Sequence, residues 1–172
     1  ETFNKERISL EFYSLTCVKN KENIAFFLIN IDDFGYINNT IGYTQGNELL
    51  RKFATFLKFR YGDDYVSRIN EDEFLILYPY KNIPNIEEEI SDLFYEVNFQ
   101  NFIDIHNIFI SISAGISIYM KDSENFDELF KFADISLYNS KISGKNRFTF
   151  YSKEMSESTY KMLDMIKDVK IG

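Results

Sequence analysis

A continuous hydrophobic run occupies residues 24–29, Ile-Ala-Phe-Phe-Leu-Ile. A run this short without polar interruption is typical of a strand that is buried on both faces. It leads directly into the sequence Asn-Ile-Asp-Asp at residues 30–33. Because side chains alternate along a strand, Asn30 and Asp32 are expected on one face and Asp33 on the other. The pattern therefore predicts a buried strand over about 24–31 that carries polar groups to the edge of the core.

A second strand pattern lies on both sides of residues 70–73, in Val66, Ile69, Phe74, Ile76 and Tyr78. Asn70-Glu71 falls where a two-residue hairpin loop with positive φ is expected, in a hairpin spanning about 64–79. Asp72 and Glu73 would then lie at the lip of this hairpin. Such a turn by itself is usually a solvated polar surface. Carboxylates beside a turn can also hold a divalent cation, and the acidic end of the first strand favours that second interpretation.

Helical periodicity is found in several other segments. Hydrophobic residues recur every three or four positions in residues 5–20, 45–60, 85–97 and 125–143, with a short helical turn between Gly35 and Gly42. Two more strands are predicted at about 107–119, with Gly115 as a possible bulge, and at 147–151. The order β-α-α-β-β-α-β-α-β after a first helix predicts an α+β fold, with a mostly antiparallel five-stranded sheet flanked by helices.

The last segment, residues 153–169, is an amphipathic helix with Met155, Tyr160, Leu163 and Ile166. Two interpretations stay open on periodicity alone. The helix either packs on its own domain or leads into a following domain. We predict one domain over residues 1–151 and a linker helix over 152–172.

Composition narrows the class of protein. The chain has 172 residues, 45% of them hydrophobic, which suits a single domain with a proper core. The 18 Phe and 12 Tyr residues reflect a compositional bias. The net charge of −8 argues against a nucleic-acid surface, because phosphate backbones require Lys and Arg.

Cysteine and histidine each occur once, as Cys17 and His106. A disulfide within the chain is therefore impossible, and a zinc site is not expected. No segment approaches the roughly 20 apolar residues that span a bilayer, so we expect no membrane contact and a cytoplasmic location. The chain starts at Glu1 without a Met, and we expect it to be a fragment of a longer protein.

Three motifs resemble those of the GGDEF family. Residues 30–50 resemble its first signature, Asp-x-Asp-x-Phe-Lys-x-x-Asn-Asp-x-x-Gly-His-x-x-Gly-Asp-x-x-Leu. Residues 70–74, Asn-Glu-Asp-Glu-Phe, resemble the Gly-Gly-Asp-Glu-Phe hairpin. Residues 133–146 are similar to the family's late helix and its phosphate-contacting end. The resemblance covers about residues 3–151 and implies a fold like that of nucleotide cyclase catalytic domains.

The resemblance implies a chemistry as well. Active members join two GTP molecules into cyclic di-GMP across two facing domains, with Mg²⁺ bridging the phosphate oxygens. The metal ligands map to Asn30, the backbone carbonyl of Ile31 and Asp72, and the catalytic carboxylates to Asp72 and Glu73. Guanine contacts map to Asn38 and Asn47, and phosphate contacts to Lys141 and Lys145. Without the resemblance, these two lysines would be ordinary cations at a helix C-terminus.

Several of these positions depart from the family pattern. Asn30 replaces an Asp and so removes one of two negative charges toward Mg²⁺, and Asp32 is the candidate to make up for it. Asn70 and Glu71 replace the two glycines, and Glu71 adds bulk and charge where the nucleotide would lie.

Other departures affect nucleotide contacts. Gly35 stands for a Lys, Asn47 for an Asp and Lys145 for an Arg, and Lys lacks the bidentate fork of Arg. The family's product-inhibition motif maps to Tyr61 and Asp64, where its Arg is absent, so feedback binding is not expected.

Three functional hypotheses follow. The first is a degenerate, catalytically inactive GGDEF domain that regulates a neighbouring domain, commonly an EAL phosphodiesterase, through GTP binding or homodimerisation. The second is an active diguanylate cyclase that tolerates the changes. The third is a binding module without a nucleotide role.

Overall fold

The structure is built on one five-stranded sheet with the strand order β2-β3-β1-β4-β5. The computed structural model describes residues 2–21, 23–100, 102 and 108–171. The central strand β1 (Ile24–Ile31) pairs antiparallel with β3 (Glu73–Pro79) and β4 (Ile112–Ile118). β2 (Val66–Asn70) forms the hairpin with β3, and β5 (Phe148–Phe150) runs parallel to β4. The predicted α+β class and mostly antiparallel sheet are confirmed.

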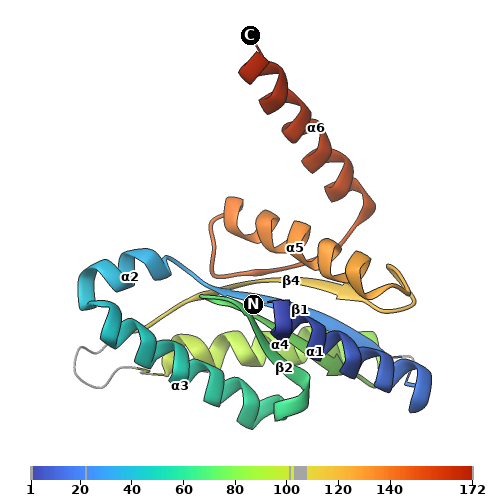
Figure 1. Cartoon of the computed structure of the whole chain (residues 1–172), viewed down its shortest axis with the longest axis horizontal. Coiled ribbons are helices and arrows are strands. Elements are labelled where there is room, and N and C mark those ends of the chain that lie inside the picture. The colour runs from blue at the N-terminus through green and yellow to red at the C-terminus, as the bar shows by residue number, and fades with distance from the viewer. Residues whose placement is uncertain (1, 22, 101, 103–107, 172) are drawn as a thin grey trace.

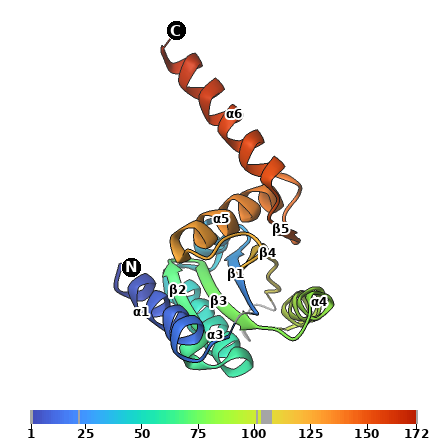
Figure 2. The same ribbon diagram turned by 90° about the vertical axis from the view of Figure 1, so that its right-hand side faces the viewer.

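Helices cover both faces of this sheet (Figures 1 and 2). On one face lie α2 (Phe34–Ile41), α3 (Tyr43–Tyr61) and α4 (Ile83–Phe99). On the other lie α1 (Thr2–Tyr13) and α5 (Phe126–Ile142). α6 (Lys153–Ile171) starts over α5 and extends away from the sheet (Figure 1). The sheet is thus the middle of three layers, and α6 lies outside them.

Alternation along β1 supplies both halves of the core. Phe27 and Ile29 belong to the cluster with α3 and α4, whereas Phe26 and Leu28 belong to the cluster with α1 and α5. All eight residues of β1 are buried. The ring of Phe26 meets that of Phe12 from α1 edge to face at 5.3 Å. The phenylalanine-rich composition is therefore used largely to fill this interior.

The predicted order of elements is confirmed, with changes at several ends. A π-helical turn, Ser14–Val18, follows α1, and the two together cover residues 2–18, where a helix was predicted over 5–20. α4 begins before Asn85 because the side chain of Asn82 accepts a hydrogen bond from the Asn85 amide at 3.2 Å and caps the helix. β4 is shorter than predicted and begins at Ile112. Residues 103–107, with His106, lie outside the described residues.

Gly115 is not a bulge, contrary to the sequence prediction. It pairs in regular register with Leu28 on one side and Thr149 on the other. A Cβ at this position would lie 1.9 Å from the Ala133 carbonyl oxygen and 2.3 Å from the Leu137 nitrogen. The glycine is needed because α5 packs directly on the backbone of β4.

An ion pair joins α3 and α4, which lie on the same face of the sheet. Arg60 Nε donates to Glu89 Oε1 and Arg60 Nη1 to Glu96 Oε1, each at 2.7 Å. Arg60 is the last but one residue of α3, and both glutamates belong to α4. Its neighbour Tyr61, at the position that lacks the family's inhibitory Arg, is largely buried against Phe27 and Tyr78. Arg60 therefore serves helix packing and does not replace that Arg.

We predict that Gly115→Ala lowers the free energy of unfolding by about 2–3 kcal/mol, because the added methyl group forces α5 off β4. Urea denaturation measures this difference. Gly35→Ala is the matched control, since a Cβ at Gly35 meets nothing within 4 Å and its effect should stay within about 1 kcal/mol. Equal stability of the two variants would contradict the packing argument.

Candidate functional site

The end of β1 is fixed to the tip of the β2–β3 hairpin. The Asp72 carbonyl oxygen accepts hydrogen bonds from the Ile31 amide at 3.0 Å and from Asn30 Nδ2 at 3.3 Å. Asn30 is 7% exposed and lies opposite Glu73 in the β1–β3 register. The amide of Asn30 therefore binds the hairpin backbone, which a carboxylate in its place could not do, since it has no hydrogen to donate.

The hairpin turn differs from the sequence prediction. Asn70 pairs with Glu73, so the loop consists of Glu71 and Asp72 and does not contain Asn70. Neither Asn70 nor Glu71 is among the residues with positive φ. The pairing register shifts between Arg68 and Asn70, and this irregularity moves the turn by one residue. The positive φ expected at Glu71 is therefore absent, whereas its exposed charge and bulk remain.

The side chain of Arg68 on β2 holds this turn in place. Its Nε donates to the carbonyl oxygens of Asn70 at 3.2 Å and Glu71 at 2.9 Å. The charged guanidinium of Arg68 donates both hydrogen bonds, so this turn is held in place without a glycine. The conformation of the loop thus follows from a side chain outside the family signature.

Glu73 lies among several charged groups at the hairpin lip. Burial raises the pKa of its carboxyl, and the nearby Asp134 carboxylate raises it further. Lys141 and a hydrogen bond from Asn70 Nδ2, at 3.3 Å, act in the opposite direction. Desolvation also raises the pKa of Asp134, and Lys141 again lowers it. The structure therefore brings together Asn30, Asp72, Glu73 and Lys141 from the predicted site, and adds Asp134.

Asp134 was not predicted as a site residue. It lies seven positions before Lys141 on α5, and residues two turns apart share one face of a helix. That spacing is the sequence signal that could have revealed it.

Asp32 does not have the role expected of it. It is 5% exposed, and its carboxylate accepts hydrogen bonds from the hydroxyls of Ser111 and Ser113, both at 2.6 Å, and from the Asn146 amide at 3.0 Å. These bonds tie the end of β1 to β4 and to the loop after α5. Its negative charge is thus engaged in holding the fold and does not compensate for Asn30.

Lys145 and Lys141 both lie near carboxylates of the protein. The Lys145 ammonium forms an ion pair with Asp33, which precedes α2. Lys141 is close enough to Glu73 and Asp134 to shift the pKa of both. The two lysines predicted to contact phosphate are therefore each accompanied by carboxylates of the protein.

The two predicted guanine contacts lie in the α2–α3 hairpin. Asn38 is 6% exposed, packed against Gly46, and its Oδ1 has no hydrogen-bond partner within the described part of the chain. Asn47, next to Gly46 on α3, is exposed. A buried acceptor without a partner is uncommon and is suited to receive a donor from a ligand.

The donor set does not fit a pair of magnesium ions. Among the described residues, no three Asp, Glu, His or Cys side chains converge as in a metal centre. The amide nitrogen of Asn30 faces the Asp72 carbonyl, and the Asp32 carboxylate is bound by serines. The hairpin itself offers the anionic oxygens of Asp72 and Glu73, and hard cations need several such ligands.

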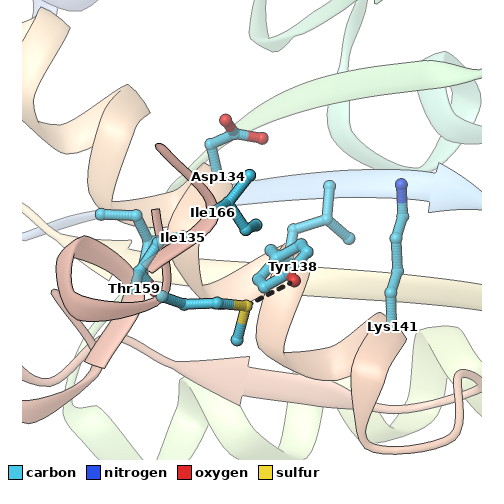
Figure 3. Close-up of a pocket in the computed structure, with 8 residues that line it drawn as sticks. Asp134, Ile135, Tyr138, Lys141, Thr159 and Ile166 are labelled. Carbon is cyan, nitrogen blue, oxygen red and sulfur yellow. Dashed lines mark hydrogen bonds between the residues drawn. The ribbon is translucent and has the colours of Figure 1, made fainter. Parts of the chain in front are cut away.

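A pocket of about 300 Å³ adjoins this charged group (Figure 3). It lies between α5 and α6 and is lined by Asp134, Ile135, Leu137, Tyr138, Lys141, Thr159, Met162 and Ile166. The Tyr138 hydroxyl is 3.3 Å from the sulfur of Met162 and joins the two helices. Lys141 and Asp134 therefore border both the hairpin lip and the middle of α6.

No helix in the described part of the chain has the length and hydrophobicity needed to cross a membrane.

The sheet order, the hairpin at its edge and the helical layers define an α+β domain of the GGDEF type. The model of the family "Diguanylate cyclase, GGDEF domain" matches residues 3–147. The chain belongs to the GGDEF domain family, a family of cyclic di-GMP signalling, as the sequence motifs predict.

Curated relatives agree with this assignment. The chain is 24% identical over 154 residues to the bifunctional diguanylate cyclase/cyclic di-GMP phosphodiesterase MucR of Pseudomonas aeruginosa, covering 89% of this chain and 22% of MucR. It is 31% identical over 149 residues to the signaling protein YkoW of Bacillus subtilis, covering 80% and 18% of the two chains. The chain thus spans about a fifth of the length of these relatives.

Solved structures show the same fold. The active GGEEF domain of a diguanylate cyclase from Vibrio cholerae superposes with a TM-score of 0.75 at 20% identity, covering 86% of this chain and 96% of that one. An EAL/GGDEF domain protein from M. capsulatus superposes with a TM-score of 0.69 at 29% identity, covering 78% and 88%.

We predict that stability falls as the pH rises through the titration range of Glu73. The folded state binds this proton more tightly than the unfolded state, so its contribution is present below the unfolded pKa and is lost above the raised folded pKa. Glu73→Gln should flatten this decline in urea unfolding measured against pH. Glu71→Gln, in the exposed turn, controls for the loss of one charge. An unchanged pH profile in Glu73→Gln would contradict the prediction.

Proposed function

We propose that this chain is a degenerate GGDEF domain without diguanylate cyclase activity that regulates a neighbouring domain of a longer protein. GTP binding or self-association would be its means of regulation, and the cytoplasm its place of action. The proposal is supported above all by the contact of the Asn30 amide with the Asp72 carbonyl, where the family pattern has a metal-binding carboxylate.

The electrostatics at the hairpin support this proposal further. Catalysis of phosphoryl transfer depends on cations and donors that stabilise charge on the phosphates. Here Glu71 adds a negative charge at the turn, and both Lys141 and Lys145 are accompanied by carboxylates. Since the donor set does not fit two metal ions, Mg²⁺ enters this proposal only as an ion carried in with a bound nucleotide.

The alternative is an active diguanylate cyclase. It is favoured by the retained Asp72 and Glu73 at the hairpin lip, with Lys141 near Glu73. The buried Asn38, with its Oδ1 facing Gly46, is also the family's guanine-contacting residue type.

We propose an EAL-type phosphodiesterase as the neighbouring domain. MucR is named for both a cyclase and a phosphodiesterase activity, and the M. capsulatus structure is named as an EAL/GGDEF domain protein. α6, which leaves the domain from the surface of α5, would be the connection (Figure 2). The boundary near residue 151 stays a prediction.

We expect no cyclic di-GMP above a protein-free blank when the purified chain is incubated with GTP and Mg²⁺. The physical reason is the missing carboxylate at position 30 and the crowded turn at positions 70 and 71. Chromatography of the nucleotides gives the measurement. Product formation at ordinary rates would overturn the proposal.

The triple variant N30D/N70G/E71G distinguishes the two hypotheses. A gain of activity on restoration supports the inactive domain, because it identifies these three positions as the obstacle. If the unmodified chain is active and the triple variant is equally active, the result supports the hypothesis of an active diguanylate cyclase. Adding D72N to the triple variant controls for the source of any product, since activity through the restored site requires that carboxylate.

Calorimetry separates a nucleotide-binding domain from a module without a nucleotide role. We expect weak heats of binding with GTP that shrink in Asn38→Ala, since Asn38 offers the buried acceptor. Asn39→Ala, at an exposed neighbouring position of α2, is the matched control. Absence of heat with and without Mg²⁺ would favour a module that uses the fold alone.

A further inference from the structure

Two loops that are far apart in the sequence meet at the end of β1. Asp33, directly before α2, forms an ion pair with Lys145, in the loop after α5. Next to this pair, the Asp32 carboxylate accepts a hydrogen bond from the Asn146 amide at 3.0 Å. The contacts are made by neighbouring residues on both sides, so the two loops are joined at two points.

The backbone on both sides is set in an uncommon conformation. Asp33 has a φ of 54°, Lys145 a φ of 62° and Asn146 a φ of 46°. Residues other than glycine adopt such values uncommonly, Asp and Asn more readily than Lys. Next to Asp33, the Asp32 carboxylate is held by buried hydrogen bonds from Ser111 and Ser113. The two loops that carry Asp33 and Lys145 are therefore held in position beside each other.

We infer that Asp33 is an intramolecular competitor for Lys145. The Asp33 carboxylate pairs with the ammonium group that the phosphates of a guanine nucleotide would otherwise contact. It thereby lowers the affinity of the domain for those phosphates. This inference rests on the proposed function, in which the domain binds GTP and Lys145 contacts phosphate. Asp33 thereby becomes a residue that sets nucleotide affinity, at a position that the first family signature leaves variable.

The solvent exposure of the Lys145–Asp33 pair determines how strongly Asp33 competes with phosphate. The side chains of Lys145 and Asp33 are 43% and 57% exposed, so the pair is screened by water and can be broken by a ligand. Lys141, the other predicted phosphate contact, is accompanied by Glu73 and Asp134. A triphosphate must therefore displace Asp33 from Lys145, whereas a nucleoside without phosphate leaves this pair in place.

Asp33→Asn tests this inference. Asn tolerates a positive φ and the position before a helix, so the substitution removes charge with little change in backbone. We expect GTP to bind two- to fivefold more tightly, because an exposed ion pair is weak. Guanosine should bind with unchanged affinity, since it carries no phosphate. Calorimetry with both ligands measures the two effects.

Asp127→Asn is the matched control. Asp127 lies near the start of α5, at the far end from Lys145, and is also paired with a lysine, Lys5, at 3.7 Å. Its substitution changes the net charge equally without touching the two loops. GTP affinity should therefore stay that of the starting protein, which excludes a general effect of charge.

A second measurement needs no nucleotide. The hydrogen bond to Asp33 raises the pKa of the Lys145 ammonium, and only the neutral amine reacts with acylating reagents. Asp33→Asn should therefore speed acetylation of Lys145 by acetic anhydride, read by peptide mass spectrometry. The same spectra report the other lysines, whose rates should not change.

The outcomes are distinct. Tighter GTP binding with unchanged guanosine binding supports the inference, as does GTP binding that appears only in Asp33→Asn. An equal change for both ligands, no change for GTP, no GTP binding in either protein, or an unchanged acetylation rate at Lys145 overturns it. None of these results alters the cyclase assay, which measures product, so failure of the inference and failure of the proposed function remain separate.

Discussion

The burial of β1 on both faces and along both edges is the constraint on which the rest of the structure depends. Its position between β3 and β4 fixes where its last residues emerge. The Asp72 carbonyl accepts the Ile31 amide, and the Asp32 carboxylate accepts the hydroxyls of Ser111 and Ser113. One strand end thus positions the hairpin tip, β4 and the loop after α5 relative to one another.

The same constraint explains how the fold persists while side chains at the site depart from the family pattern. The core depends on apolar contacts, such as those of Phe26 and Phe27, and on backbone pairing, and neither requires a charged side chain at the mapped metal ligands. Asn30 keeps the strand–hairpin contact through an amide in place of an ion. The site can therefore lose anionic charge without loss of the sheet that carries it.

Much of the fold was predictable because its signals are local. The hydrophobic run gave β1 at its true bounds, and Asn125 marks the start of α5, where its side chain accepts from the Glu128 amide at 3.1 Å. The turn was misplaced by one residue, because a register shift depends on pairing with β3. The partners of Asp32 and Asp33 lie about 80 to 115 residues away, and no spacing rule connects them. Contacts between distant loops require the tertiary structure.

The double ion pair of Arg60 has a consequence for the variability of the signature loop. It links residues 60 and 89, and the whole β2–β3 hairpin lies in the stretch of chain between them. The Arg60 guanidinium therefore holds the two ends of this stretch together. Substitutions in the hairpin turn, far from those ends, leave this link intact. Side chains can therefore differ at Asn70 and Glu71, at the far end of this stretch, while its two ends stay linked through Arg60.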